Sequence, residues 1–197
     1  MCPRTAEQVE QIRDERRRAL LRAARIVFAR KGFAAAKISD VAAEAGISHG
    51  LVYHYFPEKE SLFAATVEEA MQGWQGLVTL ARKQPGEPWD RLVYLCTEMI
   101  TGLREAPEYL LVLVHANTED ATPSAVRDLF RRHQRQTLAD IAAMIEEGQR
   151  AGQVAPGAPV ELTLALIAIV QGLAINRLVD PGGSLPPLDV VLRILRP

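Results

Sequence analysis

Cysteine is scarce in this chain, with only two among 197 residues. Cys2 and Cys96 lie far apart and show no metal-ligand spacing, so the sequence offers neither a zinc motif nor a disulfide framework. This usage suits a reducing compartment. We therefore expect a protein that holds no metal, no cofactor and no structural disulfide.

Long apolar runs are also scarce. The longest, LTLALIAIV from Leu162 to Val170, is roughly half of a membrane-spanning helix and is soon followed by Gln171, Asn176 and Arg177. The N-terminus is charged where a secretion signal would be apolar. We expect a cytoplasmic protein without a membrane segment, in which this run forms a buried helix.

Several motifs of catalysis are missing. The chain has no glycine-rich phosphate loop and no H-E-x-x-H zinc motif. No glutamate precedes a histidine by three residues, as a di-iron helical bundle requires. We therefore predict that the protein is not an enzyme.

Positive and negative charges nearly balance over the whole chain, but they are unevenly distributed along it. The net charge is −1, yet residues 1–63 carry about +3 and residues 64–197 about −4. A basic N-terminal segment on an acidic body points mildly to nucleic acid as a partner.

Strand patterns are nearly absent, since apolar residues recur every three or four positions throughout. The sequence therefore predicts an all-α fold of about nine helices. They are expected at 6–30, 38–45, 49–56, 57–83, 89–104, 107–117, 123–151, 160–179 and 188–195.

Glycine and proline mark where these helices begin and end. Gly32 is expected to end the first helix, and Pro57 to stand in the first turn of the fourth. Thr122 before Pro123 is expected to cap the seventh helix. We predict two domains, residues 1–57 and residues 58–197.

Residues Ile38 to Phe56, ISDVAAEAGISHGLVYHYF, have the spacing of a helix-turn-helix. Gly46 supplies the left-handed turn residue, and small Ala42 lets the second helix cross closely. Val41, Ala45 and other apolar residues would form the core between the helices. Ser48 would cap the second helix.

The outward face of the second helix carries groups that suit DNA. His49, Gly50, Tyr53 and His54 lie on this face, with Leu51 near its start. Imidazole and phenol groups can bond to base edges or phosphates, and a leucine can contact a thymine methyl. Each residue also has a plainer interpretation as solvated surface or packing.

From Ala19 to Phe63 the sequence, ALLRAARIVFARKGFAAAKISDVAAEAGISHGLVYHYFPEKESLF, resembles the TetR family of transcriptional regulators. The resemblance covers about a quarter of the chain. Beyond it, the chain matches that family only in the number and lengths of its helices.

The resemblance implies roles for individual residues. Tyr53 and the segment 49–51 would face bases, while Tyr55 and Lys59 would hold phosphates. Ser39 matches a helix-start position near the DNA. Lys37 departs from the family's Ser or Thr, which removes a cap worth about 1 kcal/mol but offers a lysine to a phosphate.

The body is expected to form a homodimer and to bind an effector. The resemblance implies that the last two helices pair with a second copy, with Leu166, Val170 and Leu173 as candidate interface residues or, equally, as core within one chain. Isolated polar and adaptable side chains on apolar faces suggest a small-molecule pocket. The candidates are Cys96, Met99, Tyr109, His115, Asn117, Met144 and Gln171.

The predicted function is a ligand-responsive regulator, most simply a repressor that binds a near-palindromic operator in double-stranded DNA as a dimer. A small-molecule effector would release it. Two alternatives remain: a transcriptional activator on the same fold, and a helical adaptor that binds protein without specific DNA binding.

Overall fold

The computed structural model describes residues 6–197, and the side chains of residue 8 and residues 10–197. Within this range the chain forms nine α-helices and a final 3₁₀ turn, with no strand, which confirms the all-α prediction. The helices are α1 (Ala6–Ala35), α2 (Ile38–Ala45), α3 (His49–Tyr55), α4 (Lys59–Arg82), α5 (Pro88–Glu105), α6 (Glu108–Thr118), α7 (Ser124–Arg150), α8 (Pro159–Val179) and α9 (Leu188–Leu192), with the 3₁₀ turn at Arg193–Leu195. Cys2 and the start of the predicted first domain lie outside the described residues.

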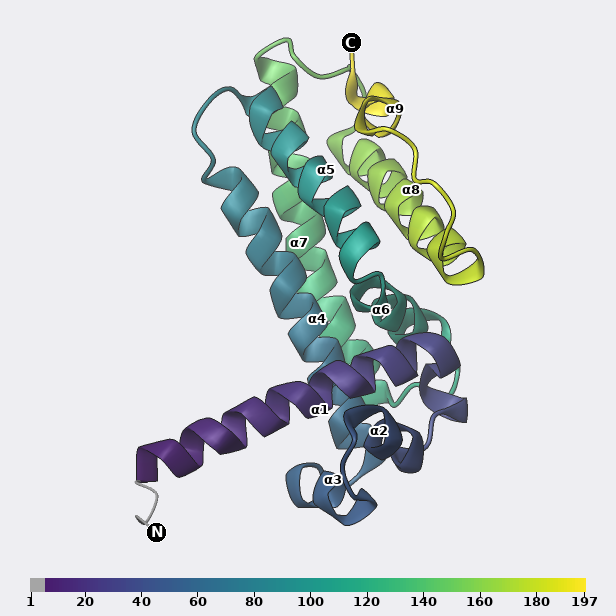
Figure 1. The fold of residues 1–197 in the computed structure, drawn as a ribbon. Helices are drawn as coiled ribbons and strands as arrows, with labels where there is room; N and C mark the ends of the chain where they lie inside the picture. The colour runs from purple at the N-terminus through teal and green to yellow at the C-terminus, as the bar shows by residue number, and fades with distance from the viewer. Residues whose placement is uncertain (1–5) are drawn as a thin grey trace.

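The helices form a bundle with a smaller layer across one end (Figure 1). Helices α4, α5, α7 and α8 make the bundle, and α9 packs against α5 at its upper end. Helix α1 crosses the lower end, where α6 packs along it, and α2 and α3 lie below. The first half of α1 projects well beyond the rest of the chain.

The predicted helix boundaries hold to within a few residues, but two capping predictions were wrong. Helix α4 begins at Lys59 with Glu58 as its N-cap, so Pro57 lies before the helix and not in its first turn. Helix α7 begins after Pro123 without a side-chain cap. Thr122 is buried, and its hydroxyl donates to the carbonyl of His115 at 3.4 Å.

Gly32 interrupts α1 as expected, for a reason that involves a distant residue. Its φ of 70° leaves the helical region and favours glycine. A Cβ at this position would lie 1.7 Å from a carboxylate oxygen of Glu119. That carboxylate accepts hydrogen bonds from the N–H groups of Phe33 at 2.8 Å and Ala34 at 3.3 Å. The residue just after α6 thus satisfies backbone donors exposed by the break in α1.

Lys59 satisfies the carbonyl groups at the same end of α1. Its Nζ donates to the carbonyls of Phe33 at 2.9 Å and Ala36 at 3.2 Å, and lies 4.4 Å from the centroid of the Phe33 ring. The ammonium group that was expected at a DNA phosphate therefore has a structural task within the chain. Its contact with phosphate stays a prediction.

Two hydrophobic cores organise the molecule. The first joins α1, α2 and α3 to the first half of α4 and to parts of α6 and α7, with Phe28 and Phe63 fully buried at its centre. The second lies within the bundle around Leu92, Ile141 and Leu166. The first core contains residues on both sides of position 57, among them Leu62 to Met71. The domain boundary at 57/58 stays a prediction.

Helix α8 is only partly covered within the single chain, and its expected burial against a second copy stays a prediction. It is long and apolar enough to cross a membrane, yet only 22% of its most apolar window is buried within the described chain. Leu166 and Val170, proposed for a dimer interface, are 0% and 2% exposed and belong to the chain's own core, while Leu173 is only partly buried. The exposed large apolar residues of α8 are Val160, Leu164, Ile175, Leu178 and Val179.

Candidate functional site

The turn between α2 and α3 has the geometry that the sequence predicted. Gly46 takes the left-handed conformation at φ 65° and ψ 31°, and the N–H of Ile47 donates to the carbonyl of Ala42 at 3.0 Å. Ser48 is the N-cap of α3, with its hydroxyl accepting from the N–H of Leu51 at 3.3 Å. The turn is thus closed by the backbone of α2 and by the first polar side chain of α3.

The two short helices are held by a few apolar side chains. Val41 and Val52 are fully buried, Ala42 is 5% exposed, and Ala45 and Ile47 pack against them. Because α3 has only seven residues, it would not persist alone, and its position depends on this packing.

The outward face of α3 is uncovered. His49, Gly50, Tyr53 and His54 are exposed, and Leu51 is partly exposed. The rings of His49 and Tyr53 meet edge to face at 5.0 Å between centroids, which orders two polar aromatic groups on one surface. This face has the length and chemistry of a helix that enters the DNA major groove.

The residues expected near the DNA backbone are placed differently from one another. Lys37 and Ser39 are exposed at the start of α2, and Tyr55 is partly buried with its ring 5.5 Å from that of His54. Ser48 is used as a helix cap. Contacts of these residues with DNA stay predictions.

Asp40 holds the backbone of Lys37, the residue at the N-cap of α2. The carboxylate of Asp40 accepts from the N–H of Lys37 at 3.0 Å and pairs with Lys31 Nζ at 2.9 Å. The Lys31 ammonium and the Lys37 N–H together hold the pKa of Asp40 below its usual value.

Residues 46–50 spell G-I-S-H-G, the letters of the G-x-S-x-G nucleophile elbow of hydrolases. That elbow joins a strand to a helix and exposes the serine hydroxyl at a sharp turn. Here the segment joins two helices, and Ser48 is used as an N-cap. The G-x-S-x-G letters at residues 46–50 are therefore part of the helix-turn-helix and do not form a hydrolase nucleophile elbow.

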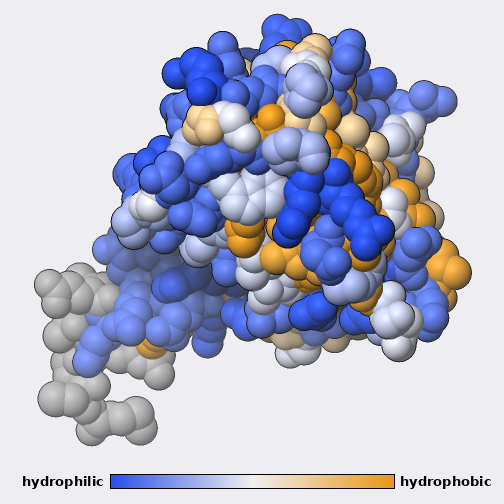
Figure 2. All heavy atoms as spheres, turned by 90° about the horizontal axis from the view of Figure 1, so that it is seen from above, coloured by the Kyte–Doolittle hydropathy of each residue, from blue (hydrophilic) through white to orange (hydrophobic). Residues whose placement is uncertain are grey.

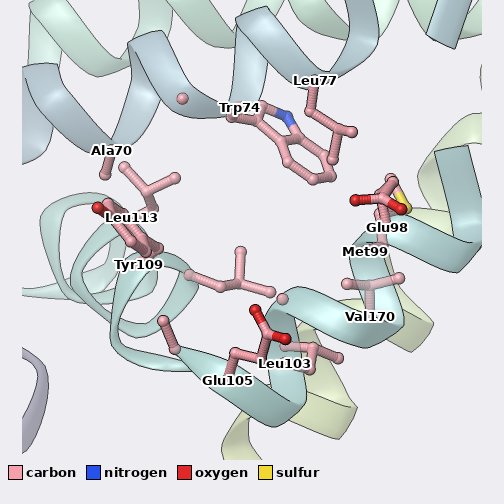
Figure 3. A pocket seen from close by; sticks show the side chains of 14 residues that line it. Ala70, Trp74, Leu77, Glu98, Met99, Leu103, Glu105, Tyr109, Leu113 and Val170 are labelled. Atoms are coloured by element: carbon pink, nitrogen blue, oxygen red, sulfur yellow. The ribbon is translucent and has the colours of Figure 1, made fainter. Parts of the chain in front are cut away.

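A cavity of about 320 Å³ lies between α4, α5 and α6 (Figure 3). Small residues on two facing helices create it, because a Cβ at Gly73 or Gly102 would meet no atom within 4 Å, and Ala70 and Ala106 lie beside them. The larger side chains that line the space are Trp74, Leu77, Met99, Leu103, Tyr109, Leu110, Leu113 and Val170.

Two carboxylates give this apolar cavity its charge. Glu98 and Glu105 lie two turns apart on α5, on either side of Gly102, and both line the cavity with their oxygens toward it (Figure 3). Neither carboxylate forms a hydrogen bond or an ion pair with any side chain that the structure describes. No lysine or arginine is among the described residues that line the cavity.

The predicted pocket residues divide into three groups. Met99 and Tyr109 line the cavity, and Gln171 lines a much smaller adjoining space of about 30 Å³. The others lie elsewhere. Cys96 and Met144 are buried in the bundle core, and Asn117 is exposed at the end of α6.

Burial raises the pKa of the Cys96 thiol to about 12, so it is neither ionised nor reactive at neutral pH. His115 is also outside the cavity. Its Nε2 lies 3.1 Å from the carbonyl of Ala29, and its Nδ1 lies 2.6 Å from Glu119. Cys96 and His115, like Met144 and Asn117, do not line this cavity, and their role in effector binding stays a prediction.

Sequence reasoning missed Trp74, Glu98 and Glu105. The available signal was the pattern of α5, where two glutamates seven residues apart flank Gly102 on one helical face. That pattern does not say which helix faces it, because α4 is brought opposite only by the tertiary fold.

Tyr109 is one of the residues that connect the cavity to α1. Tyr109 lines the cavity, and the guanidinium carbon of Arg25 from α1 lies 3.5 Å from the centroid of the Tyr109 ring. Arg25 is 7% exposed, and its Nε has no hydrogen-bond partner. A change at Tyr109 therefore meets α1 directly at Arg25.

Comparison with known families matches both parts of the chain. The family model of bacterial regulatory proteins of the tetR family matches residues 20–66. The model of the C-terminal part of BetI-type transcriptional repressors matches residues 88–196. Together they cover the helix-turn-helix and most of the bundle.

Curated relatives agree with these models. The HTH-type transcriptional regulator BetI of Brucella abortus is 27% identical over 147 residues, covering 73% of this chain and 74% of that protein. The HTH-type regulator YhgD of Bacillus subtilis is 27% identical over 175 residues, covering 89% and 88%.

Solved structures share the fold. A TetR-family regulator from Agrobacterium tumefaciens matches with a TM-score of 0.76 at 20% identity, covering 92% of this chain and 94% of that one. AibR, solved with isovaleryl coenzyme A and operator DNA, matches with 0.72 at 18% identity, covering 90% and 94%. A regulator from Saccharomonospora viridis, solved with choline, matches with 0.70 at 23% identity, covering 91% and 93%. The chain belongs to the TetR family of transcriptional regulators, with a C-terminal domain of the BetI type.

Proposed function

We propose that this regulator is a cytoplasmic repressor that binds a near-palindromic operator as a homodimer and is released by a small organic cation. The uncovered polar and aromatic face of α3 carries the proposal. Val52 on the inner face of this helix is buried in the core, whereas His49, Tyr53 and His54 on the outer face are exposed to solvent. These groups suit base edges in the major groove.

The homodimer is supported by the surface of α8. Leu164 and Val179 are 51% and 81% exposed, and Ala168 and Gly172 are exposed between them on the same helical face. Apolar residues come to the surface on the right of the molecule, the side on which α8 lies (Figure 2). A second copy of α8 would remove this face from water and set two α3 helices on half-sites about 34–36 Å apart.

The cavity favours a cationic effector. Glu98 and Glu105 are unpaired anions at an apolar space, and Trp74 and Tyr109 offer aromatic rings to a cation. Of the ligands in the two related structures, choline matches this chemistry, whereas isovaleryl coenzyme A carries negative phosphates. A volume of about 320 Å³ is also small for a coenzyme A thioester.

The contact between Arg25 and Tyr109 supports release of DNA on binding. A ligand cation against the Tyr109 ring would compete with the guanidinium of Arg25 for the same aromatic group and repel it. Since α1 carries the helix-turn-helix, loss of that contact would shift the DNA-reading layer. A coupling of about 1–3 kcal/mol is sufficient for such a regulator.

The first test is selection on a random double-stranded DNA library with the wild type and a Tyr53→Ala, His54→Ala variant. We expect a near-palindromic consensus for the wild type and none for the variant, because the variant loses two exposed groups of α3. A Gln72→Ala variant, exposed on α4, is the matched control. Absence of any consensus across low and moderate salt would favour a protein adaptor.

The second test measures release of the selected operator by choline, its neutral isostere 3,3-dimethylbutanol and isovaleryl coenzyme A. We expect choline-sized cations to release DNA and the neutral isostere to be much weaker. A Glu98→Gln, Glu105→Gln variant should bind the operator but lose the preference for charge. Release by the coenzyme A thioester and not by cations would overturn the assignment of the ligand class.

A further inference from the structure

The first half of α1 is a helical arm without packing of its own. Among the described side chains of α1, Leu20 is the first that is buried, and residues 10–19 are exposed apart from partly buried Ile12. The arm leaves the body on the side of α3 (Figure 1) and forms a hydrophilic projection at the lower left of Figure 2. An isolated helix of this length is marginal in water, so it gains no stability from standing free.

Three arginines lie together on one face of this arm. At about 100° per residue, Arg13, Arg16 and Arg17 fall within about 100° of arc, on the face that continues through Leu20 toward the core. All three are exposed, and none forms an ion pair with a described side chain. Glu10 is the acidic residue at the edge of this face.

The opposite face of the arm is built differently. Arg18 and Arg22 alternate there with Asp14 and Glu15, and the Nε of Arg18 donates to the carbonyl of Asp14 at 3.4 Å. Positive charge on that face is largely balanced by neighbouring acids. The arm therefore has one cationic face and one mixed face.

The cationic face lies near the C-terminal end of α3. The guanidinium carbon of Arg17 lies 5.4 Å from the ring centroid of Phe56, the buried residue that directly follows α3. Arg13 and Arg16 follow within one turn toward the N-terminus, so the arginines extend outward from α3. Arginine forks match phosphate oxygens in geometry and charge.

We propose that the arm of α1 binds the phosphate backbone of double-stranded DNA outside the half-site that α3 reads, with Arg13 and Arg16 as the phosphate ligands. The proposal rests on the operator binding proposed above. It adds a longer footprint and affinity that does not depend on sequence, because phosphate contacts position a protein without reading bases.

The test uses the full-length protein and two duplexes, one trimmed to the selected operator and one with ten additional base pairs on each side. Binding of the wild type, Arg13→Gln/Arg16→Gln and the control Arg18→Gln/Arg22→Gln is measured by fluorescence anisotropy from 50 to 200 mM salt. Each variant loses two positive charges, and all four substituted arginines are at exposed positions of α1. Glutamine is a good helix former, so folding is kept.

We expect the wild type and the control to prefer the flanked duplex, and Arg13→Gln/Arg16→Gln to bind both duplexes alike. For a dimer with two contacts per protomer, the slope of log affinity against log salt should fall by about 3 to 4 for this variant only. Equal slopes for the two variants, or no effect of flanking DNA, would overturn the proposal while leaving operator binding intact. Failure of the wild type to bind any operator would overturn both proposals.

Discussion

The DNA-reading unit and the effector cavity are built by opposite means. The unit of α2 and α3 is closed by neighbours in sequence, with Gly46 at the turn, Ser48 at the cap and Asp40 bonded three residues back to Lys37. The cavity is closed by residues from α4, α5, α6 and α8 that span a hundred positions. One is specified by local spacing and the other by the packing of distant helices.

This difference suits the two tasks. A recognition helix has to present the same face to every operator, so local bonds that fix its geometry are an advantage. A cavity between long helices can change shape when a ligand enters, since its walls belong to elements that shift relative to one another. The contacts of Arg25 with Tyr109 and of Glu119 with Phe33 join the two regions.

The largest effect is expected at the core that the two regions share. Phe63 is fully buried, with its ring centroid 4.8 Å from that of Phe28 and 5.0 Å from that of Phe33. Phe63→Ala should lower the free energy of unfolding by about 3–5 kcal/mol. Urea denaturation followed by tryptophan fluorescence checks this, because Trp74 and Trp89 both report on the bundle. An unshifted fluorescence transition would mean that the two regions unfold independently.

The next prediction compares two glycines of positive φ, of which only Gly32 also contacts Glu119. Gly32→Ala should cost about 1–3 kcal/mol for its positive φ, and more because the new Cβ meets the Glu119 carboxylate. Gly46→Ala is the control, since it has a similar φ of 65° and open space around it. Thermal unfolding of both variants should rank Gly32→Ala as the less stable. The reverse order would show that Glu119 does not hold α1.

A smaller effect of opposite sign is expected at two glycines inside helices. Gly102→Ala and Gly50→Ala both add a Cβ in open space, and each should stabilise its helix by about 0.5–1 kcal/mol. Gly102→Ala should weaken effector binding and leave operator affinity unchanged, whereas Gly50→Ala should do the reverse. Calorimetric titration and anisotropy measure the two affinities. If either variant lost affinity for both the effector and the operator, the cavity and the DNA-reading unit would not act separately.

The smallest effect concerns acid stability of the DNA-reading layer. Since the folded pKa of Asp40 is lowered, its contribution is present above its unfolded pKa of about 4 and is lost as pH falls through the folded value. Asp40→Asn should therefore melt below the wild type at pH 7 and together with it in strong acid. A difference that persists at low pH would point to a role independent of charge.

Much of the DNA-reading unit was predictable because its determinants are close in sequence. The bounds of α2, the turn at Gly46, the cap at Ser48 and the exposure of Tyr53 follow from helical spacing and turn chemistry. Lys59 was harder to interpret, since its ammonium bonds to carbonyls some 25 residues away. A sequence pattern shows that a lysine is present but not which group it meets.

The lining of the cavity and the exposed face of α8 could not be read from the sequence, for the same physical reason. Cys96, Met144 and His115 look suitable as polar or soft groups on apolar helices, yet packing buries the first two in the core and directs the third toward Ala29. Leu166 and Leu164 are equally apolar, and only the crossing of α8 with its neighbours decides that the first is 0% and the second 51% exposed.

The sequence by itself determined an all-α chain, the helix-turn-helix and the residues on the outward face of α3, because these depend on periodicity and on the conformational preferences of single residues. Only the tertiary structure decided where the cavity lies, that Glu98 and Glu105 face it unpaired, and that Arg25 meets Tyr109. Those relations depend on which helix faces which, and that is set by the sum of many packing contacts between segments far apart in the chain.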